Sequence, residues 1–269
     1  MGLINLIFLR SIQFNSQNGV KNKYPFNVAD KLMPDTLDFP TPVTFFVGEN
    51  GSGKSTILEA IAAKINLPAI GGEAIAYDKT LDATRQLSKY MKLVWNRRTH
   101  RGFFMRSEDF FNFTRRIFNL SQELAAEAQS FENSLSGYGL QLAQGTVRGQ
   151  RQALIEKYGE DLQANSHGEA ILRVLIQRIV PDGIYLLDEP ETPFSPQRQL
   201  SLISIIKQMV EENCQFIIAT HSPILLAFPN AAIYSFDEVP VQIKKYDELE
   251  HVNLTRDFLN TPEAFLRHL

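Results

Sequence analysis

A glycine-rich run directly after a short apolar segment constrains this chain more than any other feature. Residues 43–47 are β-branched or aromatic at every position, and Gly48–Ser55 then reads G-x-x-x-x-G-K-S. Apolar residues recur from Ile57 to Ile65 at the spacing of one helix face. A buried strand, a glycine turn and a helix in this order predict a loop whose backbone N–H groups surround a phosphate.

Each fixed position of this loop has a physical role. The glycines let the backbone turn tightly, Lys54 brings a positive charge to the β- and γ-phosphates, and Ser55 offers a hydroxyl to Mg²⁺. The helix that begins near Lys54 aims its positive dipole end at the same anion. The expected nucleotide-binding residues are Gly48, Glu49, Asn50, Gly51, Ser52, Gly53, Lys54, Ser55 and Thr56.

Two acidic residues follow a second apolar run. Residues 184–187 predict a buried strand, and Asp188 and Glu189 come directly after it. Beside a phosphate loop, Asp188 is expected to hold Mg²⁺ directly or through water. Glu189 is expected to take a proton from the attacking water or to orient that water. The alternative is a pair of surface acids at a strand end.

Three further segments extend the pattern, and together they resemble the ATP-binding-cassette ATPases. Residues 166–169 (Ser-His-Gly-Glu) resemble the signature turn that begins a helix, and residues 220–223 (Thr-His-Ser-Pro) resemble the switch-histidine segment. Residues 191–195 occupy the place of the D-loop. The resemblance implies that ATP is bound between two subunits paired head to tail. Ser166 and Gly168 would then contact nucleotide held by the other subunit.

The same resemblance implies catalytic roles for Lys54, Glu189 and His221, with His221 contacting the γ-phosphate. Each assignment outside the phosphate loop has a plainer alternative. A histidine after a buried strand can be a packing residue, and a serine before Gly-Glu can be an ordinary helix N-cap.

The chain departs from the transporter members of that superfamily. No leucine precedes Ser166, and Ser195-Pro196 stands where transporters usually carry an aspartate. These features are closer to the non-transporter branch, which includes chromosome-maintenance and break-repair ATPases and small stand-alone AAA-like ATPases. The expected function is an ATPase that works as an ATP-dependent dimer and couples hydrolysis to a partner.

The order of segments predicts an α/β P-loop NTPase fold with a mostly parallel central sheet flanked by helices. Antiparallel strands are expected at the N-terminus, where prolines at 34, 40 and 42 leave only short strands and turns in the first forty residues. We expect one domain over 1–269. Its nucleotide-binding core would be 1–79 and 170–269, and an inserted helical subdomain of about 80–169 would end in the signature motif.

Two expected contacts are carried by weaker signals. The residue that couples the helical subdomain to Mg²⁺ is usually a glutamine, and Glu108 is the candidate here because it follows the apolar segment 102–105. The aromatic that stacks on adenine is expected to be Tyr24 or Phe26. The alternatives are a surface acid and core packing.

One segment has a composition of its own. Residues 89–116 contain eight lysines and arginines against Glu108 and Asp109, with a tryptophan and five phenylalanines interleaved. Basic and aromatic side chains together suit nucleic acid, because the cations hold phosphates and the rings stack on bases. An acidic partner protein could use the same patch. A helical subdomain with inward rings and solvated charges is the plainer interpretation.

Bulk composition limits the remaining classes. The formal net charge is −3, and Cys214 is the single cysteine, which fits a reducing compartment and a cytoplasmic location. The N-terminus lacks a basic region and cleavage site typical of a signal peptide, and no stretch has the length of a membrane span. An ATP-gated nucleic-acid clamp with slow turnover is the alternative function, and a transporter subunit is the third.

Overall fold

The structure, a computed structural model, describes residues 7–14, 24–32, 35–70, 81–133, 135–158 and 167–267. It contains two compact units. Unit 1 consists of Met1–Arg106 and Ile179–Leu269, and unit 2 of Ser107–Arg178. The helical part therefore begins at Ser107, whereas the sequence suggested a helical insertion from about residue 80. Residues 91–95 and 102–106 instead form two strands, because their apolar side chains join the sheets of unit 1.

Unit 1 is built on a six-stranded sheet of mixed, mostly parallel strands. Its order is β5 (Gly102–Arg106), β6 (Ile184–Asp188), β7 (Gln215–Ala219), β3 (Val43–Val47), β8 (Ala232–Ser235) and β9 (Gln242–Ile243). All neighbours pair in parallel except β8 and β9. Every residue of β3, β6, β7 and β8 is buried, as expected for strands covered on both faces.

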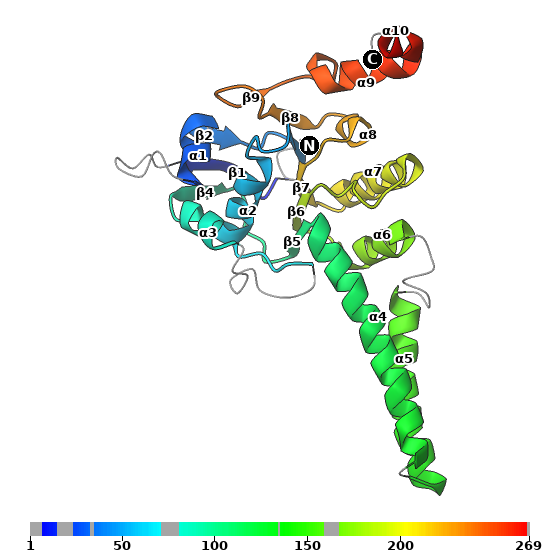
Figure 1. Ribbon diagram of the computed structural model, residues 1–269. Helices are drawn as coiled ribbons and strands as arrows, with labels where there is room; N and C mark the ends of the chain where they lie inside the picture. The colour runs from blue at the N-terminus through cyan, green and yellow to red at the C-terminus, as the bar shows by residue number, and fades with distance from the viewer. Residues whose placement is uncertain are drawn as a thin grey trace. The chain divides into compact units, whose positions relative to one another are not determined.

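Helices flank this sheet on both sides. Figure 1 shows α2 (Lys54–Ile65) and α3 (Asp82–Ser88) on one side and α7 (Pro196–Glu211) and α8 (Pro223–Leu226) on the other. The chain then continues through η5 (Tyr246–Glu248), α9 (Glu250–Asn260) and α10 (Pro262–Leu266). The predicted fold class is confirmed.

A second, antiparallel sheet of three strands completes unit 1. Its order is β2 (Thr36–Asp38), β1 (Leu9–Phe14) and β4 (Met91–Trp95). Gln215 ties the two sheets together. Its fully buried side chain accepts from the N–H groups of Phe8 and Leu9 and donates to the Leu9 carbonyl, each at 2.9 Å.

The N-terminal region also contains a helix that the sequence analysis did not expect. Helix α1 (Phe26–Leu32) lies within the first forty residues, where only strands and turns were predicted. That expectation was wrong because Pro34 lies beyond the last residue of the helix and so does not interrupt it. The Phe26 ring meets the Tyr90 ring edge-on, with centroids 5.2 Å apart, and this contact anchors the helix.

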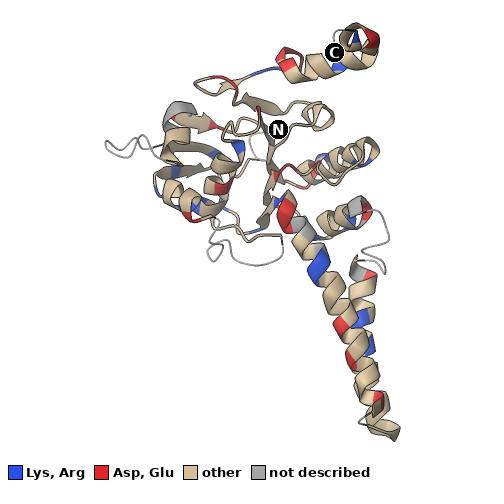
Figure 2. Cartoon of the chain, viewed as in Figure 1, with Lys and Arg blue, Asp and Glu red and all other residues tan. Residues whose placement is uncertain are grey.

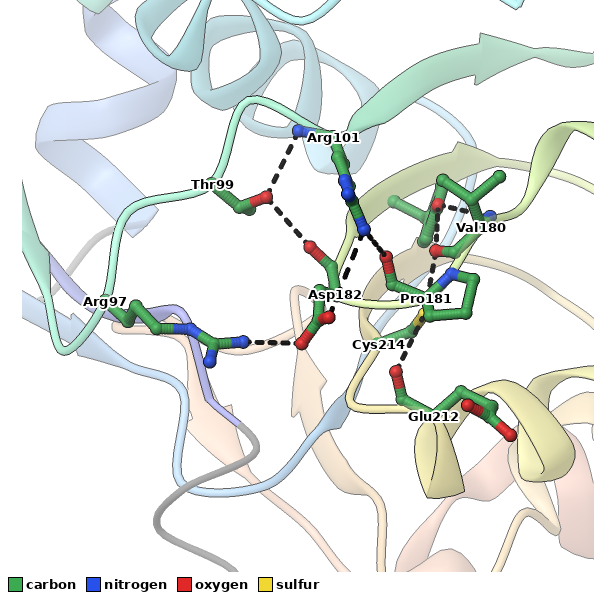
Figure 3. Close-up of polar contacts among 9 residues, drawn as sticks. Arg97, Thr99, Arg101, Val180, Pro181, Asp182, Glu212 and Cys214 are labelled. Atoms are coloured by element: carbon green, nitrogen blue, oxygen red, sulfur yellow. Dashed lines mark hydrogen bonds and ion pairs between the residues drawn. The ribbon is translucent and has the colours of Figure 1, made fainter.

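Polar contacts hold the loop after β4 against the turn before β6 (Figure 3). Arg97 donates to the Asp182 carboxylate at 2.7 Å, and Thr99 donates to the Asp182 carbonyl at 2.8 Å. Arg101 donates to the Pro181 carbonyl at 3.1 Å. Two of the basic residues in segment 89–116 therefore have a structural role in fixing this corner of unit 1.

Unit 2 is helical. It consists of α4 (Ser107–Ser130), the short 3-10 helix η4 (Phe131–Asn133), α5 (Gly137–Tyr158) and α6 (His167–Arg178). Helices α4 and α5 form a hairpin whose core is Leu124, Ala128 and Val147. Lys, Arg, Asp and Glu are interspersed along the hairpin (Figure 2). None of the helices in the described ranges combines the length and apolar character needed to cross a membrane.

Candidate active site

The phosphate loop and the acidic strand end lie side by side, although their residues are 133 positions apart. Ser55 Oγ donates to Asp188 Oδ1 at 3.1 Å. Parallel pairing of β3 with β7 and of β7 with β6 brings the C-terminal ends of these strands to one edge of the sheet. Helix α2 begins at Lys54, as the motif predicted. The buried Lys54 ammonium donates to the carbonyls of Gly48 at 2.7 Å and Glu49 at 2.9 Å.

Gly48 is required by both conformation and space. Its φ is +152°, and an added Cβ would lie 2.9 Å from Asp237 Oδ1 and 3.1 Å from the Phe236 Cβ. The same Asp237 oxygen accepts a 2.7 Å hydrogen bond from the backbone N–H of Glu49. Asp237, just beyond β8, therefore braces the beginning of the phosphate loop.

Asp188 carries the most perturbed carboxyl of the site. Burial raises its pKa from 3.8 to about 7, and the neighbouring Glu189 adds to the rise, while the hydrogen bond from Ser55 and the charge of Lys54 oppose it. Desolvation dominates because only 8% of the residue is exposed. A cation bound at this carboxylate would stabilise its charged form, which burial has separated from water.

Glu189 and His221 face one another at the ends of β6 and β7. His221 Nε2 lies 3.7 Å from Glu189 Oε1, and each side chain is more than a third exposed. The backbone of Glu189 has a φ of +48°, and its N–H donates to the Ala219 carbonyl. Burial, then the charge of Lys54, lowers the pKa of His221, so the imidazole is neutral at pH 7. Its Nε2 has no hydrogen-bond partner among the described residues.

Glu191 is a third carboxylate at this edge, and the sequence analysis gave it only a place in the D-loop. Its Oε1 accepts from the backbone N–H of His221 at 2.8 Å, so it positions the histidine segment. Burial raises the pKa of Glu191, and its Oε2 is buried without a hydrogen-bond partner in the described part of the chain. An acid three residues beyond a strand end could have indicated this role.

The C-terminal part of unit 1 adds two residues that the sequence analysis missed, Asp237 and His251. His251, in the first turn of α9, has a buried Nε2 without a described partner. Burial lowers its pKa, while the charge of Asp237 raises it and that of Lys54 lowers it. Asp237 follows an apolar strand, as Asp188 does, and that signal could have found it. No sequence pattern marks His251.

The donor set fits Mg²⁺ bound together with a triphosphate. Ser55 Oγ and Asp188 Oδ1 are hard oxygen donors, which is the type that Mg²⁺ prefers. Among the described residues no three His, Cys, Asp or Glu side chains converge as a complete metal site. Two protein oxygens with phosphate oxygens and water are the usual set for this ion beside a nucleotide. The negative charges of the buried acids must also be neutralised by a cation before a triphosphate can bind beside them.

The remaining predicted site residues lie in different surroundings: some are exposed, one packs against the core, and one lies outside the described residues. Tyr24 is more than half exposed, and its hydroxyl lies 3.4 Å from Thr56 Oγ1 on α2, whereas Phe26 packs against the core. Glu108 is exposed in the first turn of α4 in unit 2. Ser166 lies outside the described residues. Gly168 lies in the first turn of α6, and its surroundings are not described.

Known proteins show similarity over most of the chain. The L-cystine transport system ATP-binding protein TcyN of Escherichia coli is 26% identical over 68% of this chain and 70% of its own length. An ABC transporter ATP-binding protein of Haemophilus influenzae, uncharacterized by its description, is 27% identical over 83% of this chain and 81% of its own.

Among solved structures, the Smc head domain of Pyrococcus furiosus bound to the C-terminal domain of ScpA has a TM-score of 0.47. It is 14% identical, and the match covers 93% of this chain and 99% of that chain. A nucleotide-free ATP-binding cassette from an ABC transporter has a TM-score of 0.47 and 13% identity, over 92% and 95% of the two chains.

Family profiles match directly. An AAA-domain profile matches residues 33–64, and a second, described as "AAA domain, putative AbiEii toxin, Type IV TA system", matches residues 71–227, more than half of the chain. The second match includes Asp188, Glu189 and His221. The chain therefore belongs to this AAA-domain family and is a P-loop ATPase of the AAA/ABC class.

Proposed function

We propose that this ATPase binds Mg-ATP at the edge formed by β3, β6 and β7 and hydrolyses it to ADP and phosphate as a head-to-tail dimer. The 3.1 Å contact between Ser55 Oγ and Asp188 Oδ1 carries the proposal, because it joins the phosphate loop to the acidic strand end. In the proposed complex the amides of residues 48–56 bind the phosphates. Ser55 and Asp188 hold Mg²⁺, which offsets the phosphate charge when it is bound.

The remaining groups act on the transferring phosphoryl. The Lys54 ammonium leaves the loop carbonyls to contact the β- and γ-phosphates. Glu189 accepts a proton from a water in line with the γ-phosphate, and the neutral His221 imidazole donates to a γ-phosphate oxygen through its unsatisfied Nε2. Catalysis by this set is positioning and charge stabilisation. Tyr24, exposed beside α2, is the proposed platform for adenine.

Ser166 and Gly168 are proposed to complete the active site of the other subunit, because α6 begins at His167 and a helix N-terminus suits a γ-phosphate. Unit 1 then corresponds to the nucleotide-binding core and unit 2 to the helical subdomain. Glu108, at the start of unit 2, is proposed to respond to the bound ion.

We place the chain in the non-transporter branch. The matching family description names no transporter, and Pro196, the first residue of α7, follows Ser195 where a transporter D-loop carries an aspartate. In this proposal hydrolysis separates the subunits and acts on a partner bound through segment 89–116. The curated relatives of TcyN type favour a transport subunit, so co-purification with a membrane protein would contradict the assignment.

The Glu189→Gln variant tests the mechanism and the dimer together. It keeps the shape of the side chain but cannot accept a proton, so ATP binding should remain and turnover should fall by about 100-fold or more. The trapped state should be a dimer, seen by light scattering on a sizing column with Mg-ATP and absent with Mg-ADP.

Lys54→Ala is the matched control, since it should lose ATP affinity and stay unpaired under both conditions. Turnover of Glu189→Gln at the wild-type rate would refute the assignment of the base. A monomer with ATP bound and turnover abolished would leave the base in place and refute the dimer.

A further inference from the structure

A basic pocket lies on unit 1 away from the proposed nucleotide site. It has a volume of about 570 Å³, which is within the range of sites for small ligands. The residues that characterise it are Lys64, Lys89, Lys92, Trp95, Arg98 and His100. No aspartate or glutamate is among the described residues that line it. The pocket therefore carries four positive charges in a chain whose net charge is −3.

These four cationic side chains form no hydrogen bonds or ion pairs with the described residues. Arg97 and Arg101, from the same loop, contact Asp182 and Pro181 (Figure 3). In contrast, Lys64, Lys89, Lys92 and Arg98 make no side-chain hydrogen bond or ion pair within the ranges that the structure describes. Mutual repulsion among unpaired cations favours the binding of an anion, since the anion would neutralise several of them at once.

Trp95 gives the pocket an aromatic surface. It is partly buried, packs against the core of unit 1 and is one of the residues that line the pocket. It is held in place by β4, which pairs with β1 at Leu9. A ring fixed by the core and partly open to solvent is a platform on which a flat ligand can stack with little loss of side-chain entropy.

The pocket is separate from the ATP site because the two lie at opposite ends of one helix. Lys54 begins α2, and Lys64 and Ile65, which line the pocket, end it. Twelve helical residues span about 18 Å. A single nucleotide bound at Lys54 would not fill the pocket, so its ligand must be a different molecule.

We propose that the basic pocket binds single-stranded nucleic acid, with phosphates at Lys64, Lys89, Lys92 and Arg98 and a base against Trp95. A pocket of nucleotide size accepts an unstacked base, whereas a duplex keeps its bases inside the helix and presents only phosphates. An acidic peptide would satisfy the cations and leave the tryptophan face without a flat partner. This inference rests on the proposed function only for what the binding achieves in the ATPase. The binding of nucleic acid to the pocket itself needs no ATP.

Trp95 is the only tryptophan of the chain, so its fluorescence reports on this pocket alone. The 269-residue protein without nucleotide is titrated with an oligothymidylate of about 15 nucleotides, a duplex of the same length and poly-glutamate. We expect the oligothymidylate to quench the emission and to bind at least tenfold more tightly than the other two. With four phosphate contacts to a single strand, the affinity should fall by about 50-fold between about 50 and 200 mM salt.

Lys92→Glu and Lys207→Glu form a matched pair, because both side chains are exposed in unit 1 and only Lys92 lines the pocket. Lys92→Glu should weaken binding at least tenfold and flatten the salt dependence, and Lys207→Glu should change neither. A thermal melt of each variant shows that it is folded. Equal weakening in both variants, equal affinity for the duplex or poly-glutamate, or no quenching would overturn the proposal. ATP binding, measured separately, tests the proposed function and not this pocket.

Discussion

Asp188→Asn should make the protein without nucleotide more stable at neutral pH. The native carboxyl has a pKa of about 7 against an ordinary value of 3.8, chiefly because it is buried. The difference between the two pKa values corresponds to about 4 kcal/mol of destabilisation at pH 8, where the native carboxylate is charged. An asparagine removes the charge and still accepts from Ser55. Its amide N–H groups need new partners, so we expect a net gain of about 2–3 kcal/mol.

The gain in stability of the Asp188→Asn variant should depend on pH, and it should increase as the pH rises. Between pH 4 and pH 7 the native state binds more protons than the unfolded state, since the pKa of Asp188 is raised on folding. The stability of the wild type therefore falls as the pH rises through this window. At pH 5 the penalty is about 1.5 kcal/mol, so the advantage of the variant should grow by about 2–3 kcal/mol from pH 5 to pH 8.

Mg-ATP should reverse the order of stability. At a ligand concentration of about 1,000 times its Kd the wild type gains about 4.1 kcal/mol, which exceeds the expected advantage of the variant of about 2–3 kcal/mol. The variant lacks the carboxylate that is proposed to hold the ion, so it should gain much less. The same substitution would then stabilise the empty protein and weaken the loaded one.

Urea unfolding followed by circular dichroism, in EDTA at pH 5 and pH 8 and then with Mg-ATP, measures all three effects. Comparing the two pH values removes any constant change caused by the new amide. An advantage that is absent at pH 8, or that stays the same at both pH values, would show that burial of the Asp188 charge does not dominate this site. Ser55→Ala is the control, because it removes the hydrogen bond and keeps the carboxylate.

Two further substitutions test contacts on which the fold and the loop depend. Gln215→Leu leaves the N–H groups of Phe8 and Leu9 and the Leu9 carbonyl without their partner, so the free energy of unfolding should fall by at least about 3 kcal/mol in urea titrations; a loss below about 1 kcal/mol would contradict the bridging role. Gly48→Ala adds a Cβ 2.9 Å from Asp237 Oδ1 and should weaken ATP binding at least tenfold by calorimetry; unchanged affinity would show that the loop can shift aside.

Local patterns were enough to predict the central motifs. A strand, a glycine turn and a helix are encoded within about twenty residues, and the structure has β3, the loop and α2 in that order. An apolar run that ends in Asp188 needs only its neighbours in the chain to be recognised as a strand end. The same reasoning correctly predicted a mostly parallel sheet, because apolar strands alternating with helices have no other way to cover both faces.

Local patterns failed where another element decides the outcome. Residues 91–106 read as part of a helical insertion, yet pairing of β4 with β1 and of β5 with β6 makes them strands. The aromatic Phe26 begins a helix because Tyr90, sixty-four positions later, packs against it. Intrinsic preference differs by less than 1 kcal/mol per residue for most residues, so burial against a distant partner overrides it.

Tertiary structure alone also decided how the charges of segment 89–116 are divided. Arg97 and Arg101 contact the turn at Asp182, eighty-five positions from Arg97, whereas Lys89, Lys92 and Arg98 line an open pocket. Asp237 and Glu49 meet across 188 positions, and no pattern in the sequence links them. The sequence by itself predicted the strand, glycine turn and helix of the phosphate loop and the apolar strand that ends in Asp188. The side chains that brace or surround that motif were fixed only by packing, because a contact between distant segments depends on the placement of every element between them.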